Sequence, residues 1–230
     1  MLKILSWNIR QGGGSRTTAI VSKLANEKAD IIVLSEFRNG ESGNRLRSAL
    51  MKIGYRHQVV SGEKNGVNSV LIASTFAAGS ELYSDADEKF THNIATAVFP
   101  AFKVMGVYLP HKKRNNLLPY INNKVKNDDA HYIIAGDYNT GINHVDQVGK
   151  SFWYEDELIK LKKNGYVDAF RHIHGDIKEY SWYSHQGNGY RYDHTYVDEA
   201  LIPIVKDCYY LNSWREEKLS DHSPMVLELG

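Results

Sequence analysis

The stretch HYIIAGDYN, residues 131–139, joins an apolar run to a pair of polar side chains. Its first six residues form the short, β-branched kind of run that predicts a buried strand. Asp137 and Asn139 follow it, and two residues apart at a strand end they can face one pocket. The carboxylate could take a proton from a water molecule while the amide holds that water or a phosphate oxygen. The alternative interpretation is an ordinary turn, because Gly, Asp and Asn are common there.

Five other polar segments are of the same kind and are spread along the chain. They are SWNIR (6–10), SEFR (35–38), YLP (108–110), YRYDH (190–194) and SDHSP (220–224). Several follow apolar runs with the character of strands, among them LKIL, DIIVL and KVMGV. Carboxylates, amides and a histidine at strand ends can present a metal ion and a phosphate to one rim of a sheet. The pattern therefore predicts Mg²⁺-assisted cleavage of a phosphoester.

Two of these segments supply an acid and an amide close to strand ends. Glu36 ends the run DIIVLSE, where a buried carboxylate needs a cation or a hydrogen-bond donor. It can be an oxygen ligand for Mg²⁺ or, alternatively, the partner of Arg38 in an ion pair. Asn8 ends the first strand and could contact a phosphate oxygen or a metal-bound water, or be an asparagine at the edge of the core.

An adjacent acid and imidazole, Asp221 and His222, stand just before the last predicted strand. Asp193 could orient His222, because a carboxylate on one ring nitrogen sets the tautomer and raises basicity. His194 competes for this role but ranks lower, since neighbouring side chains of a strand face opposite ways. A capped turn with a solvent-exposed histidine is the alternative.

A phenol and a basic run lie together in the middle of the chain. Tyr108 ends a predicted strand, and its hydroxyl could donate to a phosphate oxygen. HKKR (111–114) follows at once. Basic runs are commonly solvated surface, but beside a phosphate site this one could attract a polyanion.

The overall composition is that of an ordinary globular protein. The 230 residues carry a net charge of +1, which neither requires nor excludes a nucleic-acid partner. The single cysteine, Cys208, cannot form an internal disulfide and fits a reducing compartment. The opening residues have too short an apolar run for a signal peptide, and no stretch is long enough to span a membrane. We expect a cytoplasmic monomer that does not associate with membranes.

The predicted elements mix β-α-β units with β-hairpins and show no linker or repeat. Helices are expected at Thr17–Glu27, Asn44–Ile53, Asn115–Lys126 and 153–164. Strands are expected at 2–8, 30–36, 55–60, 67–73, 93–99, 102–109, 131–136, 180–184, 190–198, 204–211 and 224–229. A single parallel sheet would alternate more strictly. We therefore expect one α/β domain, 1–230, with two sheets packed face to face and helices outside.

Taken together, the segments resemble the endonuclease/exonuclease/phosphatase superfamily, and within it the exonuclease III class of abasic-site endonucleases. The resemblance covers essentially the whole chain. Its most specific part runs from GDYN through GYVDAFRH (165–172), SWY (181–183) and RYD (191–193) to SDHSP. The segment VDAFRH matches the family signature V-D-[ST]-F-R-H at all but one place.

The resemblance implies a four-layer α/β sandwich of the DNase I-like type, with Mg²⁺ or Mn²⁺ as cofactor. It makes Glu36 the principal metal ligand and places Asp221 near the metal or near a second metal position. The implied catalytic residues are Asp137 and Asn139 on the attacking water, Asn8 and Tyr108 on the scissile phosphate, and His222 paired with Asp193. The implied substrate-binding residues are Asp168, Arg171, Trp182, Tyr190, Arg191 and Tyr192.

The chain also departs from the family pattern. Arg10 occupies the second Asn place of the opening N-x-N-G-[IL]-R, and Ser35 stands where Gln precedes the metal-binding Glu. The loops before GDYN and between SWY and RYD are short, although in the family they grip duplex DNA and the flipped-out sugar. Tyr190 and Tyr192 replace the more usual aliphatic or tryptophan side chains of the sugar pocket.

The leading interpretation is a Mg²⁺-dependent nuclease that acts on DNA by direct attack of water. A phosphatase or small-molecule phosphodiesterase of the same superfamily is the second, favoured by the short loops, whereas HKKR and VDAFRH favour the nuclease. A catalytically dead binding module on this fold is the third. The presence of Glu36, Asp137, Asn139 and His222 argues against it.

Overall fold

The computed structural model describes residues 1–62, 64–86, 90–111 and 117–230, and two six-stranded mixed sheets carry its fold. The strands of sheet 1 are β1 (Leu2–Asn8), β2 (Ile31–Arg38), β3 (His57–Val60), β4 (Asn68–Ser74), β13 (Val205–Tyr210) and β14 (Met225–Leu229), in the order β13-β14-β1-β2-β4-β3. The strands of sheet 2 are β5 (Gly79–Leu82), β6 (Ile94–Val98), β7 (Lys103–Tyr108), β8 (Tyr132–Asp137), β9 (Tyr166–Asp168) and β12 (Asp193–Asp198), in the order β5-β6-β7-β8-β12-β9.

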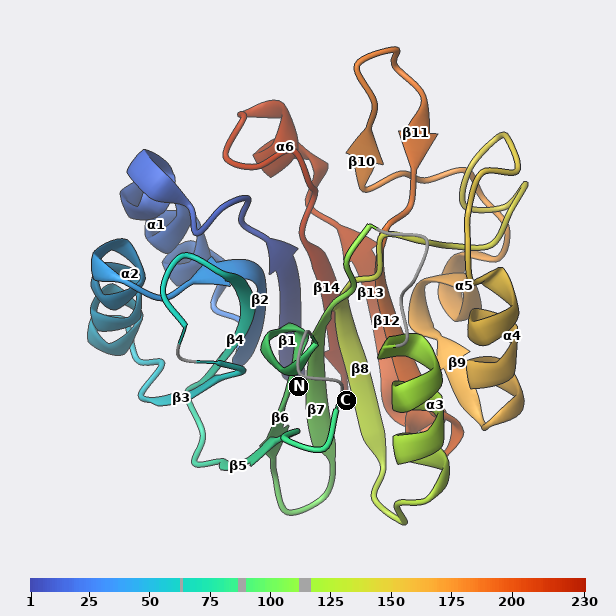
Figure 1. Ribbon diagram of the computed structural model, residues 1–230, viewed down its shortest axis with the longest axis horizontal. Coiled ribbons are helices and arrows are strands. Elements are labelled where there is room, and N and C mark those ends of the chain that lie inside the picture. Colours follow the sequence, from blue (N-terminus) through green and yellow to red (C-terminus); the bar gives the residue numbers. More distant parts are fainter. Residues whose placement is uncertain (63, 87–89, 112–116) are drawn as a thin grey trace.

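Helices cover the outer face of each sheet. They are α1 (Thr17–Glu27), α2 (Glu41–Lys52), α3 (Leu117–Lys126) and α4 (Glu155–Lys163), with the short α6 (Asn212–Glu216). The short helix α5 (Ala169–His174) instead packs Ala169 and Phe170 into the core between the sheets. Helices α1 and α2 pack on sheet 1, and α3 and α4 pack on sheet 2. Figure 1 shows these four layers edge-on, with the sheets side by side in the middle. The predicted four-layer α/β sandwich is confirmed.

The central strands, such as β2, β4 and β8, read as nearly continuous apolar runs because both of their faces are buried. Val33 and Ile133 point between the sheets, whereas their neighbours Leu34 and Ile134 point toward the helices. Strands covered on both faces need this composition. At Gly106 the two sheets come so close that an added Cβ would lie 2.7 Å from Cγ1 of Val70.

Most of the predicted elements are present, with shifted ends. Helix α2 begins at Glu41, earlier than expected, and residues 115–116 of the third predicted helix lie outside the described part of the chain. The expected strand at 180–184 is reduced to β10 (Trp182–Tyr183), which forms a hairpin with β11 (Gly189–Tyr190). The expected strand at 190–198 begins as a regular strand only at Asp193, in β12. The sequence did not predict β5, β9, α5 or α6, because each is too short to show a period. No described helix is both long and apolar enough to cross a membrane.

Candidate active site

The register of the strands brings most of the predicted site residues to one rim. In sheet 2, Tyr108 pairs with Asp137, and Asp137 pairs with Asp193 across the next strand. In sheet 1, Asn8 at the end of β1 pairs with Ser35, the residue before Glu36. The hairpin β10–β11 and helix α6 lie at this same end of the molecule, at the top of Figure 1. The site therefore lies where the ends of the two sheets meet.

Asp137 is the buried centre of this rim. Its Oδ2 accepts hydrogen bonds from the side-chain amides of Asn8 (2.8 Å) and Asn139 (3.2 Å), and its Oδ1 accepts one from the backbone N–H of Asn139 (2.9 Å). Burial raises the pKa of the Asp137 carboxyl well above its ordinary value, and the charge of Asp193 adds to the rise. A carboxylate with a raised pKa is a stronger proton acceptor than an exposed one.

Glu36 reaches the rim because β2 bulges there. The pairing of β2 with β4 shifts between Ser35 and Phe37, and Glu36 has a left-handed φ of 56°. Bulges re-aim a side chain and are common next to active sites. Its Oε1 accepts from the Asn8 amide (3.2 Å) and the Tyr108 hydroxyl (3.4 Å), and its Oε2 accepts from the backbone N–H of Gln11 (2.8 Å).

The alternative partner of Glu36, Arg38, is engaged elsewhere. Its Nε donates to Oδ1 of Asn68 at 2.6 Å, and the Asn68 amide donates to the Tyr108 hydroxyl at 3.4 Å. Asn68 was not predicted as a site residue. The sequence could have indicated it, because Asn68 is the polar residue directly before the apolar run SVLIAS. Strand β4 is antiparallel to β2, so its first residue lies at the rim where β2 ends.

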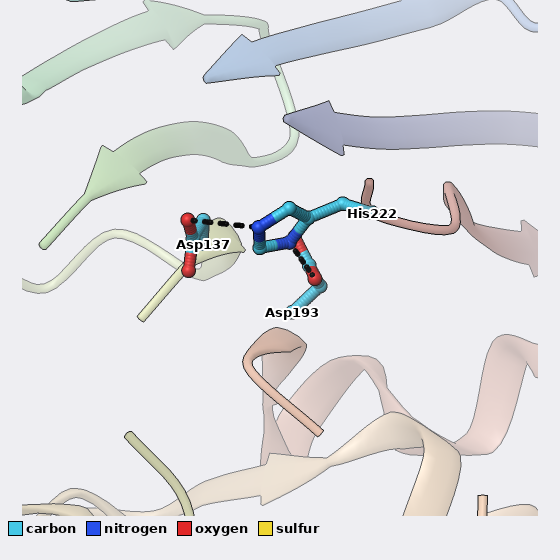
Figure 2. Close-up of side chains that lie close together, drawn as sticks. All are labelled: Asp137, Asp193 and His222. Atoms are coloured by element: carbon cyan, nitrogen blue, oxygen red, sulfur yellow. Dashed lines mark hydrogen bonds and ion pairs between the residues drawn. The ribbon is translucent and has the colours of Figure 1, made fainter. Parts of the chain in front are cut away.

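His222 and Asp193 form the predicted pair, although 29 positions separate them. Nδ1 of His222 lies 2.7 Å from Oδ2 of Asp193, and its Nε2 lies 4.0 Å from Oδ2 of Asp137 (Figure 2). Burial opposes a charge on His222, but the carboxylates of Asp193 and Asp137 outweigh it and raise the pKa of the imidazole. His194 is buried on the other face of β12, with Nε2 2.9 Å from the carbonyl oxygen of Thr140.

Asp221 lies at the solvent-facing side of the site, and in the described part of the chain its polar contacts are with residues other than Glu36. One of its carboxylate oxygens, Oδ2, accepts from Nε1 of Trp182 at 3.4 Å and lies 3.9 Å from Nε of Arg10. The side chains of Arg10 and Asp221 are 59% and 41% exposed, so both reach solvent.

Three of the expected substrate-binding residues, Asp168, Arg171 and Arg191, take part in one ion-pair network. Nε of Arg191 donates to Asp146 at 2.7 Å, and its two terminal nitrogens hold both oxygens of Asp168. Arg171 completes the network by donating to Oδ1 of Asp146, the oxygen that also accepts from Arg191. Arg191 has no exposed surface, so the expectation that it touches substrate does not fit this placement. These residues anchor the loop at 142–148 and α5 to sheet 2, and Asp146 was missed because its partners are distant in sequence.

The three predicted aromatic residues form one cluster beside His222. The rings of Tyr190 and Tyr192 stack at 5.4 Å with an interplanar angle of 11°, and Trp182 lies 5.4 Å from Tyr192. Tyr192 is 6.4 Å from the His222 ring and nearly buried. Trp182 and Tyr190 are half-buried, so the cluster leaves aromatic surface at the mouth of the site. The basic residues 112–114 of HKKR lie outside the described part of the chain.

Two groups of side chains have the chemistry to hold a divalent cation. Asp137, Asp193 and His222 each place a ligand atom within 4.8 Å of the others, and Oδ1 of Asp193 is buried without a hydrogen-bond partner in the described structure. Glu36 offers a half-buried carboxylate whose hydrogen bonds come from neutral donors. Mg²⁺ keeps several waters and uses one or two carboxylates, which suits the open position of Glu36.

The family of the chain follows from a match of its sequence to a family model. The model of the "Endonuclease/Exonuclease/phosphatase family" matches residues 5–222. The chain belongs to this family. Its members hydrolyse phosphate esters, so the predicted class of enzyme is confirmed along with the predicted family.

Individual relatives agree with the narrower resemblance to the exonuclease III class. An "Exodeoxyribonuclease" of Bacillus subtilis is 24% identical, and the alignment covers 98% of both chains. The structure of an AP endonuclease from Archaeoglobus fulgidus superimposes with a TM-score of 0.83 at 25% identity, over 100% of this chain and 99% of that one. The 3′ phosphatase NExo from Neisseria, solved with a product DNA hairpin, has a TM-score of 0.84 at 22% identity and full coverage of both chains.

Proposed function

We propose that this family member is a DNA nuclease of the exonuclease III type that requires Mg²⁺ or Mn²⁺. The observation that carries the proposal is the arrangement of Asp137. Its carboxylate is buried, is held by Asn8 and Asn139 and lies 4.0 Å from an imidazole that is paired with Asp193. Such an arrangement suits removal of a proton from water beside a phosphate.

In this proposal Asp137 is the general base for the attacking water. Asn139, fixed by its hydrogen bond to the carbonyl oxygen of Leu109 at 2.8 Å, keeps the carboxylate and the water in place. The backbone of Asn139 is left-handed (φ 47°), and its N–H donates to Oδ1 of Asp137. These two features hold Asn139 in place beside the carboxylate. Polar groups that are already fixed in place need little reorganisation during the reaction, which lowers its barrier.

His222, Tyr108 and Asn8 surround the place where the phosphate would bind. The raised pKa of His222 keeps its imidazole protonated at neutral pH, so its Nε2–H can donate to a phosphate oxygen. Tyr108 and Asn8 both donate to Glu36, and these donors would turn to a phosphate that binds beside it when the Glu36 carboxylate is occupied by a cation. A divalent cation held by Glu36 would neutralise charge on the phosphate.

DNA is the proposed substrate because the matching relatives include an exodeoxyribonuclease, an AP endonuclease and a DNA-bound 3′ phosphatase. Trp182 and Tyr190 offer exposed aromatic surface on which a base or sugar can stack. We further propose that residues 1–230 act as one domain and as a cytoplasmic monomer.

Removal of a terminal 3′ phosphate is the second candidate activity. The stacked tyrosines support it, because they and Trp182 fill the space beside His222 with packed rings. A small terminal phosphate needs less room there than a flipped-out sugar does.

The test is cleavage of labelled DNA duplexes in Mg²⁺ and in EDTA. The substrates are an intact duplex, one with a single abasic analogue and one ending in a 3′ phosphate. A Mg²⁺-dependent cut at the lesion indicates an abasic-site endonuclease, a ladder from the 3′ end indicates an exonuclease, and release of phosphate alone indicates the phosphatase. Binding of the duplexes without any product would instead favour a binding module and contradict the proposal.

A further inference from the structure

The loop that follows β1 has an unusual backbone. Five consecutive residues, Arg10 to Gly14, have left-handed φ angles between 51° and 77°. Glycine adopts this region freely, but Arg10 and Gln11 do so against the steric preference of L-residues. Non-glycine residues held in this way cluster at functional sites and ligand clamps.

Hydrogen bonds to the candidate active site hold this backbone. The N–H of Arg10 donates to Oδ1 of Asn8 at 2.8 Å, and the N–H of Gln11 donates to Oε2 of Glu36 at 2.8 Å. From the other side the guanidinium of Arg16 donates to the carbonyl oxygens of Arg10 (2.7 Å) and Ile9 (3.1 Å). The Cα of Arg10 is therefore fixed relative to the residues that would hold the cation and the phosphate.

The side chain of Arg10 extends from this fixed point toward Asp221. Its Nε lies 3.9 Å from Oδ2 of Asp221, which also accepts from Trp182. Both charged side chains reach solvent, and a solvent-exposed ion pair stabilises a fold only weakly. The strained backbone costs more than such a pair returns. A role in stability therefore does not account for the conformation of Arg10.

The two partly exposed acids of the rim, Glu36 and Asp221, differ in which groups face them. Glu36 receives hydrogen bonds from neutral donors, so its charge is available to an added cation. Asp221 already faces the guanidinium of Arg10. A guanidinium presents its donors in a planar fork that matches phosphate oxygens. With Asp221 on its Nε side, the terminal nitrogens of Arg10 are the part that a phosphate can approach.

We propose that Arg10, oriented by Asp221, is a fixed cationic subsite that binds a phosphate of the DNA strand at the active site. The proposal rests on the proposed function, because it takes DNA as the ligand. In this proposal the guanidinium of Arg10 supplies the positive charge beside Asp221. Glu36 remains the carboxylate that would hold a divalent cation.

The test measures DNA binding without cleavage. Asp137→Asn serves as the parent, and Arg10→Ala, Arg10→Lys and Arg10→Gly are added to it. Binding of a fluorescent duplex in Mg²⁺ is followed by anisotropy at several salt concentrations. Each phosphate contact contributes about 0.9 to the slope of log K against log salt. Arg10→Ala should weaken binding about tenfold at low salt and reduce the slope by about one, whereas Arg10→Lys should keep most of the slope.

The matched control is Arg56→Ala in the same parent. Arg56 is an exposed arginine before β3, and His57 pairs with Ser74, which pairs with Ile31 at the start of β2. It therefore lies at the opposite end of sheet 1 from Glu36, and its removal should leave the slope unchanged.

Neutral methylphosphonate linkages locate the contact on the DNA. When the phosphate that Arg10 binds is replaced, the parent and Arg10→Ala should bind equally, and at other positions they should keep their difference. Arg10→Gly relieves the strained backbone, so its Tm should equal or exceed that of the parent while its DNA binding falls. A lowered Tm with full DNA binding would show a structural role and overturn the proposal.

The outcomes also separate this proposal from the proposed function. If the parent binds DNA and Arg10→Ala keeps both affinity and slope, the Arg10 subsite is wrong while the nuclease proposal stands. If the wild type does not cut and the parent does not bind DNA, the nuclease proposal fails and the subsite fails with it.

Discussion

The side chain of Asp137 makes the sharpest prediction at the scale of single residues. Asp137→Asn keeps the shape and can keep the hydrogen bond from Asn8, but it removes the proton acceptor and replaces the oxygen that accepts from the N–H of Asn139. We expect kcat to fall by about 10²- to 10⁴-fold with an unchanged melting temperature. Steady-state cleavage and thermal unfolding measure the two effects. Asp129→Asn, at an exposed aspartate before β8, is the control, and equal losses in both variants would contradict the role of Asp137.

The pair of His222 and Asp193 predicts the pH dependence of activity. Asp137 must be ionised to accept a proton, and its raised pKa places the acidic limb above about pH 4, the range of an ordinary carboxyl. His222 must be protonated to donate, and its raised pKa places the basic limb above about pH 6.5. Activity should therefore rise through the first limb and fall through the second.

Asp193→Asn tests the assignment of the basic limb to His222. The variant removes the carboxylate that raises the pKa of His222, so the basic limb of kcat/KM should move to lower pH. The imidazole signal of His222 in an NMR titration should move in the same direction. A basic limb that stays in place would assign it to a group other than His222.

At the scale of elements, the close approach of the sheets at Gly106 determines how β7 packs on sheet 1. An added Cβ would lie 2.7 Å from Cγ1 of Val70 and 2.9 Å from Cγ1 of Val33, closer than carbon atoms pack. Gly106→Ala should destabilise the fold by about 1–3 kcal/mol in urea unfolding. Adding Val70→Ala should recover part of this loss by making room.

The control for this prediction is Gly79→Ala in the edge strand β5. A Cβ at Gly79 would meet Val98 at 3.5 Å, an ordinary contact, so its stability should change by less than about 0.5 kcal/mol. Similar losses at both glycines would mean that the space between the sheets is not what requires Gly106.

At the scale of the whole molecule, the network of Asp146, Arg191 and Asp168 joins segments that are far apart in the chain. Burial alone would raise the pKa of Asp168, but the charge of Arg191 holds it far below its usual range. A depressed pKa in the folded state adds stability above the pKa of the unfolded chain, about 3.9, and this stability is lost as the pH falls below it.

Asp168→Asn tests this contribution. It leaves the buried Arg191 short of one partner, so we expect a loss of about 3–5 kcal/mol in the free energy of unfolding at pH 7. The difference from the wild type should shrink in urea unfolding between pH 5 and pH 3. Asp176→Asn, at an exposed aspartate just after α5, should show no such loss. A difference that does not depend on pH would contradict the ionised pair.

The sequence by itself determined most of the strands, the longer helices, the two-sheet architecture and the family. Buried strands need apolar residues on both faces, and this requirement is written in runs such as DIIVL and HYIIA. Polar residues at the ends of those runs, such as Asp137, could also be recognised as site candidates, because the ends of neighbouring strands meet at one edge of a sheet.

Only the tertiary structure decided which of these residues meet. The left-handed turn at Arg10 and the bulge at Glu36 depend on hydrogen bonds to distant segments, and no local pattern encodes them. Arg191 lies in the same short segment as Asp193, yet one is buried in an ion-pair network and the other contacts His222. Arg191 precedes β12, and alternation along a strand would place two residues at i and i+2 on the same face, so alternation does not set that difference. Their neighbours in space set it, because charged groups are stabilised by partners that the folded chain brings near.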